Sequence, residues 1–225
     1  MRSPILAVSA AVFLILVLIL SSLPSYRIEP TVLPALGSDD YFMTMALVEI
    51  GKMNPQDGWP VGAVVVRDDK IIGRGSNQLF ATNNPTQHAE YIAVDQAIRW
   101  VKHQHPQERY DDFFEDATVY VTLEPCAMDA GKITLARFKK VVMCDFDEDW
   151  GSFGSVNNSK GYPHEVEVVL SDLPICQKLR GQHGWNTDEL WEMGRKYAAA
   201  TGQVPSLLQV VLKKLKYELK ALIIS

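Results

Sequence analysis

Short apolar runs alternate with longer amphipathic segments along the middle of the chain. The runs are rich in β-branched residues and have strand length, and they lie at residues 62–67, 70–74, 118–122, 140–144 and 166–170. The first two are separated only by Asp68-Asp69, which predicts a hairpin. The sequence therefore predicts a sheet that begins with one hairpin and continues through longer connections.

Helical periodicity fills most of the intervals between these runs. Helices are predicted from the Ser38-Asp39-Asp40 cap through Glu49, and at residues 88–102, 126–138, 173–179, 187–200 and 205–224. Strands that alternate with helices indicate an α/β sandwich whose sheet is mainly not built from hairpins. The alternation ends near residue 172, so we expect a domain at residues 39–172 and a C-terminal helical extension at residues 173–225.

The first residues show no such alternation. Residues 5–20 are apolar except for Ser9, a length between that of a signal-peptide core and that of a short membrane-spanning helix. No small-x-small cleavage site follows, so we interpret residues 1–25 as an uncleaved signal-anchor, with a cleaved signal peptide as the alternative, and residues 26–38 as a linker. This predicts a single-pass, membrane-anchored protein with a luminal or extracellular domain, or a secreted one if the segment is cleaved.

Composition limits the classes of function. A chain of 225 residues suits one domain with additions, and a hydrophobic fraction of 47% is enough to fill its core. A net charge of −5 argues against a protein that wraps nucleic acid by overall electrostatic attraction, but it does not exclude a local basic patch. Of the three cysteines, Cys144 and Cys176 are interpreted as small buried residues, and only Cys126 lies in a motif.

Two short motifs carry the predicted chemistry. His88-Ala89-Glu90 is followed by Pro125-Cys126-Ala127-Met128-Asp129, and the zinc-deaminase signature is H-x-E followed by P-C-x-x-C. Each motif opens a predicted helix, so the side chains of His88, Cys126 and Asp129 can converge on one zinc ion. Cys126 and Asp129 are three residues apart and share a helix face, and a helix N-terminus favours the ionised thiolate.

The predicted chemistry also needs a water molecule and a proton carrier. Three protein ligands leave the fourth position of zinc to water, which the metal makes easier to ionise. Glu90 lies two residues from His88, and we expect it to carry a proton from that water to the leaving amine.

A longer series of segments resembles one family. In order, these are Val61-Gly62-Ala63-Val64, Gly75-Ser76-Asn77, Asn84-Pro85-Thr86-Gln87-His88-Ala89-Glu90 and Tyr120-Val121-Thr122-Leu123-Glu124-Pro125-Cys126. The series resembles the tRNA adenosine deaminases, bacterial and eukaryotic, within the cytidine-deaminase-like family, over about residues 39–170. Residues 151–155 are similar to the glycine-rich segment of that family.

The resemblance implies a fold and a site. The fold is a three-layer α/β/α sandwich with a mixed sheet of about five strands. His88 and Cys126 would bind zinc, Glu90 would move the proton, and Asn77 would contact the substrate.

The chain departs from the family at Asp129, where the motif has its second cysteine, and at Lys132, where a small residue is usual. In one interpretation, Asp129 is an oxygen ligand of zinc, which accepts carboxylates but then binds less tightly. In the other, Asp129 is an acidic residue of a first helical turn that pairs with Lys132, and the metal site is lost.

Two functions follow from these alternatives. The first is hydrolytic deamination of a nucleobase, a nucleoside or an adenosine in tRNA, and a luminal domain favours the small molecules. The second is a non-catalytic partner subunit with an impaired metal site, and a homodimer or heterodimer is open in either case. The acidic cluster at residues 145–149 is interpreted as a solvated face, although it would repel phosphate-rich substrates.

Overall fold

The structure is a computed structural model that describes residues 32–109, 112–159, 161, 164–180 and 187–203. All of these residues belong to the compact unit Val32–Ser225, which is described here by itself. The segments predicted at residues 1–25 and 205–224 lie outside the described residues. Among the helices of the described part, none is both long and apolar enough to cross a membrane.

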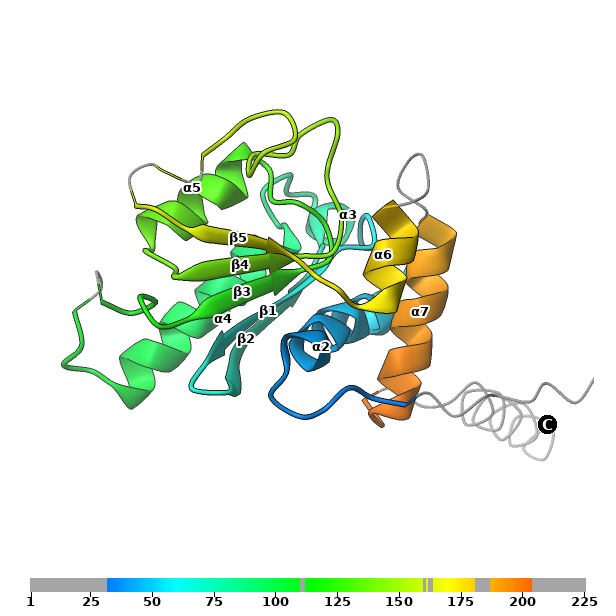
Figure 1. Ribbon diagram of the computed structural model, residues 1–225, viewed down its shortest axis with the longest axis horizontal. Helices are drawn as coiled ribbons and strands as arrows, with labels where there is room; N and C mark the ends of the chain where they lie inside the picture. The colour runs from blue at the N-terminus through cyan, green and yellow to red at the C-terminus, as the bar shows by residue number, and fades with distance from the viewer. Residues whose placement is uncertain (1–31, 110–111, 160, 162–163, 181–186, 204–225) are drawn as a thin grey trace, which may run out of the picture. The chain divides into compact units, whose positions relative to one another are not determined.

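A five-stranded mixed sheet forms the centre of the unit (Figure 1). Its strands are β1 (Gly62–Arg67), β2 (Lys70–Ser76), β3 (Thr118–Val121), β4 (Lys140–Met143) and β5 (Glu167–Leu170), in the spatial order β2-β1-β3-β4-β5. β1 pairs antiparallel with both β2 and β3, whereas β3, β4 and β5 are parallel. The predicted mixed sheet and its opening hairpin are confirmed, with Asp68 and Asp69 both at positive φ in the turn.

Helices cover both faces of this sheet (Figure 1). The helices in the described part are α2 (Asp39–Lys52), α3 (Leu79–Thr82), α4 (Ala89–Gln104), α5 (Ala127–Leu135), α6 (Pro174–Arg180) and α7 (Thr187–Ala200), of which the short α3 has no buried residue. Alternate residues of β1 show the two layers: Val65 packs in one core with α4 and α5, and Val64 packs in the other with α2, α6 and α7. The predicted three-layer α/β/α sandwich is confirmed.

Several helix boundaries differ from the sequence prediction by a few residues, and two differences stand out. The helix predicted at residues 126–138 ends at Leu135, because Arg137 adopts a left-handed conformation (φ 63°) that a helix cannot continue. The short helix α3 was not expected, and it ends at Asn83, which is also left-handed. The predicted cap of α2 is present, since the Ser38 hydroxyl accepts the N–H of Tyr41 at 3.1 Å.

Glycines in β2 set the distance between α4 and the sheet. A Cβ atom on Gly73 would lie 2.1 Å from the carbonyl oxygen of Ala93, and one on Gly75 would lie 2.1 Å from that of Ala89. No side chain fits at either position, so the backbone of α4 rests directly on β2. This contact fixes the height of the first turn of α4 above the sheet, and that turn carries His88 and Glu90.

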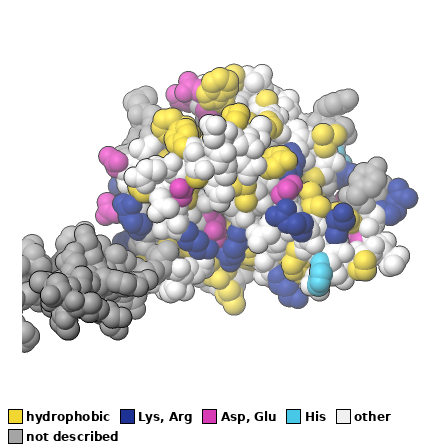
Figure 2. Space-filling model, turned by 180° about the vertical axis from the view of Figure 1, so that it is seen from behind, with side chains coloured by type: hydrophobic (Ala, Val, Ile, Leu, Met, Phe, Trp, Pro, Cys, Tyr) yellow, Lys and Arg dark blue, Asp and Glu magenta, His cyan; other side chains and the backbone are white. Residues whose placement is uncertain are grey.

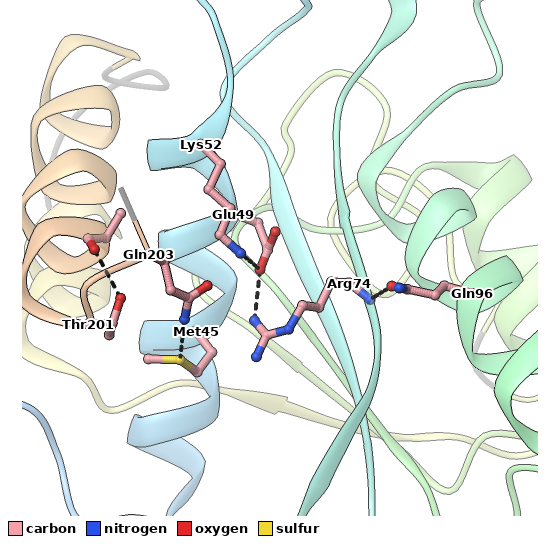
Figure 3. Close-up of polar contacts among 8 residues, drawn as sticks. Met45, Glu49, Lys52, Arg74, Gln96, Thr201 and Gln203 are labelled. Carbon is pink, nitrogen blue, oxygen red and sulfur yellow. Dashed lines mark hydrogen bonds and ion pairs between the residues drawn. The ribbon is translucent and has the colours of Figure 1, made fainter. Parts of the chain in front are cut away.

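On the opposite face, a buried carboxylate joins α2 to β2 (Figure 3). Oε1 of Glu49 accepts hydrogen bonds from Lys52 Nζ at 2.7 Å and from Arg74 Nη1 at 2.8 Å, and its side chain is only 8% exposed. The backbone N–H of Arg74 donates to Gln96 of α4 at 2.6 Å. β2 is therefore held by polar contacts on both of its faces.

A disulfide corrects the interpretation of two cysteines. Cys144, which follows β4, and Cys176 of α6 are both fully buried, as expected, but they are bonded to each other across a separation of 32 residues. A spacing of this length carries no recognisable pattern in the sequence, so the pair was not predicted. The bond ties α6 to the end of β4, immediately before the acidic segment at residues 145–149.

Replacing both cysteines by serine should lower the free energy of unfolding by about 2–4 kcal/mol, because the cross-link restricts the unfolded chain. Urea unfolding of Cys144→Ser/Cys176→Ser beside the oxidised wild type measures this loss. Cys126→Ser is the control, and it should keep the sensitivity of the wild type to reductant. Equal unfolding midpoints for the double variant and the oxidised wild type would contradict the bond.

Candidate metal centre and active site

Three predicted ligands meet where α4 and α5 begin. Nδ1 of His88 lies 2.8 Å from Oδ2 of Asp129 and 3.8 Å from Sγ of Cys126, and the Cys126 thiol donates to the same Asp129 oxygen at 3.0 Å. His88 and Cys126 are the N-caps of their helices, as the sequence predicted. The ligand atoms lie within 4.8 Å of one another, and no other group in the described ranges meets the same geometry.

The donor set fits a zinc ion. An imidazole nitrogen, a thiol sulfur and a carboxylate oxygen are all ordinary zinc ligands. Asp129 is 1% exposed, and its second oxygen, Oδ1, is buried without any hydrogen-bond partner in the described part of the chain. A buried carboxylate oxygen without a donor is costly, and a cation would satisfy it.

Lys132 does not pair with Asp129. Its ammonium group is turned to α4, where it donates to Asp95 Oδ1 at 2.8 Å and to the carbonyl oxygen of Tyr91 at 3.0 Å. The same nitrogen lies over the Tyr91 ring, 3.2 Å from its centre. The hypothesis that Lys132 draws Asp129 away from the metal position is wrong, because Lys132 already has three partners on another helix.

Burial and the neighbouring carboxylate shift the pKa values of two of the candidate ligands. Burial raises the pKa of the Cys126 thiol to about 12, and the negative charge of Asp129 acts in the same direction. The hydrogen bond to Asp129 raises the pKa of His88, although burial opposes it. Both groups therefore hold their protons more tightly than free side chains do, and a metal would have to displace those protons.

Glu90 is a buried carboxyl group in the first turn of α4. Its residue is 4% exposed, and burial raises its pKa well above the ordinary value. The charges of Asp129 and then of Asp147 raise that pKa further. A buried carboxyl group with a raised pKa retains its proton more readily than an exposed one, which suits a group that takes up and delivers a proton.

Asn77 follows β2 and is 5% exposed. Its side-chain Oδ1 accepts the N–H of Ala89 at 2.8 Å, so it holds the first residue of α4. Its backbone N–H donates to the carbonyl oxygen of Val61 at 3.1 Å. The structure thus brings Asn77 to the same helix start as His88 and Glu90, next to the three candidate ligands.

The sequence interpretation assigned no role to Glu124, although it stands inside the quoted motif. Glu124 is 2% exposed and contacts the segment at residues 145–155 through backbone N–H groups. The sequence did offer one signal: Glu124 stands between an apolar strand and Pro125, where it is expected to be buried. A buried carboxylate rarely lacks partners, so a structural role could have been expected. The acidic segment was expected to be a solvated face. Its backbone is instead hydrogen-bonded to the buried Glu124, next to the metal motif.

A hollow of about 630 Å³ is lined by residues of α4 and α5 and by Phe113 and Phe114. Its lining is mainly apolar and includes Ala127 and Met128, which stand between two of the candidate ligands in the sequence, but His88, Cys126 and Asp129 themselves do not line it. The candidate ligands therefore lie beside this hollow in the chain without forming its wall.

Known proteins match this domain. Residues 36–145 match the model of the cytidine and deoxycytidylate deaminase zinc-binding region. A tRNA-specific adenosine deaminase of Bacillus subtilis is 34% identical over 138 residues, which cover 60% of this chain and 81% of that protein. The tRNA-specific adenosine deaminase 2 of Xenopus tropicalis is 40% identical over 102 residues, or 45% of this chain and 59% of the frog protein. The match thus spans less than two thirds of the frog protein.

A solved structure supports the fold. A mutant of the protein NE0047 in complex with 8-azaguanine superposes with a TM-score of 0.51 at 18% identity, covering 74% of this chain and 87% of that one. At this identity the likeness concerns the arrangement of the sheet and its helices.

The predicted localisation is wrong. It placed the domain in a lumen or outside the cell on a membrane anchor, or secreted, and it rested on the apolar run at residues 5–20 alone. The relatives of the domain are named for action on tRNA, and the helices that the structure describes include none able to span a membrane. The predicted partnership with a membrane is not supported by these relatives.

These matches place the chain in a family. The matched residues 36–145 contain both motifs, and the chain matches the Bacillus relative at 34% identity over 81% of that protein. This chain belongs to the cytidine and deoxycytidylate deaminase family, whose zinc-binding region it carries.

Proposed function

We propose that the protein is a zinc-dependent hydrolytic deaminase that acts on adenosine in tRNA. One observation carries the proposal: Asp129 lies in hydrogen-bond contact with both His88 and Cys126, at 2.8 and 3.0 Å, where a third ligand is needed. The relatives named tRNA-specific adenosine deaminases support the substrate class. The preference for a free base or nucleoside depended on a luminal domain and no longer has that support.

In this proposal His88, Cys126 and Asp129 hold the zinc ion. A zinc ion held there would supply an activated water for attack on the ring carbon that bears the amine. Glu90 takes a proton from the attacking water and delivers it to the leaving amine, so that a C–O bond forms, the C–N bond breaks and ammonia departs. The buried position of Glu90 keeps bulk water from competing for that proton.

Asn77 has a separate task. Its Oδ1 is already bonded to the N–H of Ala89, so its side-chain amide N–H groups are the part left to donate to a substrate. It would then fix the substrate relative to the start of α4, which also carries the proton carrier.

Surface charge is relevant to how the proposed tRNA substrate would be held. On the face visible in Figure 2, lysine and arginine side chains are distributed among apolar and acidic ones, and the whole chain has a net charge of −5. A tRNA would accordingly be held by contacts close to the site more than by a broad electrostatic field.

Purified protein should contain about one zinc per chain. Asp129→Cys should bind zinc about 10- to 100-fold more tightly, because a thiolate is a softer ligand than a carboxylate. Competition with a chelator of known affinity measures the difference. Lys132→Met is the matched control: it removes the contacts to α4 and should leave zinc affinity unchanged. Absence of metal from both the wild type and Asp129→Cys would rule out the site.

Zinc affinity should depend steeply on pH. The pKa of Cys126 is about 12, so the thiol is protonated throughout the neutral range and must release its proton when zinc binds. Affinity is therefore lost as pH falls, by about tenfold per pH unit, and the slope should steepen as pH falls through the raised pKa of His88. Chelator competition between about pH 6 and pH 8 tests the sign, and a flat profile would contradict thiolate ligation.

Glu90→Gln should reduce ammonia release by about 10²- to 10⁴-fold while zinc stays bound, because the amide cannot carry the proton. The assay compares a tRNA substrate with free adenosine, guanine and cytidine. Glu49→Gln is the matched control, since it alters a buried carboxylate on the opposite face of the sheet.

The outcomes separate the two functions. Wild-type activity that Glu90→Gln removes supports the deaminase. Activity only in Asp129→Cys would mean that the aspartate silences the site. Zinc binding without activity in any of these proteins would favour a partner subunit.

A further inference from the structure

Glu124 is a buried carboxylate with no cationic partner among the described residues. It follows β3, is 2% exposed and immediately precedes Pro125-Cys126 of the metal motif. A charge in such a place is costly unless several donors satisfy it. The hydrogen-bond donors to Glu124 therefore indicate its structural role.

All the donors come from one loop. We define the cap loop as residues 145–155. Oε1 of Glu124 accepts the backbone N–H of Phe153 at 2.7 Å and that of Ser155 at 3.1 Å, and Oε2 accepts that of Asp147 at 3.2 Å. Both ends of the cap loop thus point their N–H groups at a single carboxylate, as such groups do around a bound anion.

The cap loop is also bonded directly to the metal motif. The backbone N–H of Glu124 donates to the carbonyl oxygen of Asp145 at 2.9 Å, and that of Ser152 donates to the carbonyl oxygen of Pro125 at 2.9 Å. Gly151 forms an antiparallel bridge with Cys126, one of the candidate ligands. The cap loop therefore lies against the chain that carries the thiol.

Gly151 is required for this fit. A Cβ atom there would lie 2.4 Å from Oε2 of Glu124, 2.1 Å from Oγ of Ser155 and 2.5 Å from the carbonyl oxygen of Asp147. A Cβ atom at this position would thus crowd both partners of the hydrogen bond between Glu124 and Asp147. Any side chain at Gly151 would push the cap loop off the carboxylate.

We propose that Glu124 is a positioning residue that fixes the cap loop over the mouth of the metal site, and that substrate binding depends on this placement. The proposal rests on the proposed deaminase function. Glu124 acts through the loop and not on the reacting atoms, because its two oxygens are occupied by loop N–H groups. The cap loop presents Trp150, 73% exposed, and Phe146, 41% exposed, next to the residues bonded to the motif.

Exposed aromatic rings at a site mouth suit an unpaired base, on which they can stack. A cap loop released from Glu124 would no longer hold these rings at a fixed place relative to Cys126. Substrate affinity should then fall by a larger factor than the rate of the chemical step, because His88, Asp129 and Glu90 lie on other segments.

Three variants test the proposal in the full chain. Glu124→Ala removes both carboxylate oxygens and with them all three hydrogen bonds. Glu124→Gln keeps an acceptor for Phe153 and Ser155 but opposes a donor to the Asp147 N–H. Gly151→Ala crowds the loop against Oε2 while the carboxylate itself remains. Hydrogen exchange of peptides within residues 145–159 should be about 10- to 100-fold faster in Glu124→Ala and intermediate in Glu124→Gln. Gly151→Ala should resemble Glu124→Ala.

The kinetic result should follow the same order. kcat/KM on the tRNA substrate should fall at least about tenfold in Glu124→Ala and Gly151→Ala, mainly through a higher KM, with zinc content unchanged. Glu49→Gln, a buried carboxylate on the other face, is the control and should change neither loop exchange nor KM.

Several results would overturn the proposal. They are wild-type exchange of the cap loop in Glu124→Ala, faster exchange with unchanged KM and kcat, or the same effects in Glu49→Gln. Should the wild type deaminate no substrate, the proposed function fails, and the exchange rates still decide whether Glu124 holds the loop.

Discussion

The close contact of α4 with β2 is the constraint on which the site depends. Gly73 and Gly75 allow the helix backbone to rest on the strand, and Asn77, directly after that strand, binds the first N–H of α4. The glycines of β2 therefore fix the distance of the helix start from the sheet, and the Asn77 side chain fixes its position along the sheet. His88 and Glu90 leave this start toward α5, and a shift of the helix would move both of them relative to Cys126 and Asp129.

The aspartate in place of a cysteine changes the electrostatics of the whole group. Asp129 is buried, and its charge raises the pKa of Cys126 and of Glu90 and, through a hydrogen bond, that of His88. A divalent cation would reverse the sign of the local field and favour the deprotonated thiol. The arrangement is thus suited to a bound cation, and Asp129 Oδ1, which has no hydrogen-bond partner among the residues that the structure describes, shows the same requirement.

Much of this arrangement could be predicted from the sequence because it depends on local pattern. β-Branched runs and helical periodicity predicted the sheet and its layers, and the positions of His88 and Cys126 at predicted helix starts predicted their convergence. Three features depend on contacts between distant residues and were not predictable: the Cys144–Cys176 bond, the pairing of Lys132 with α4, and the loop bonds to Glu124. The localisation was predicted wrongly because it was inferred from the hydropathy of residues 5–20 alone, without regard to the kind of domain that follows.

The choice of ligands also bears on oxidation. A pair of neighbouring thiols can lose its metal by forming a disulfide, and the chain returns to the metal-binding form only after reduction. In this protein the position beside Cys126 is a carboxylate, and the other two cysteines are already joined to each other. Oxidants therefore have one sulfur to attack in the metal group, and no cross-link can close within it.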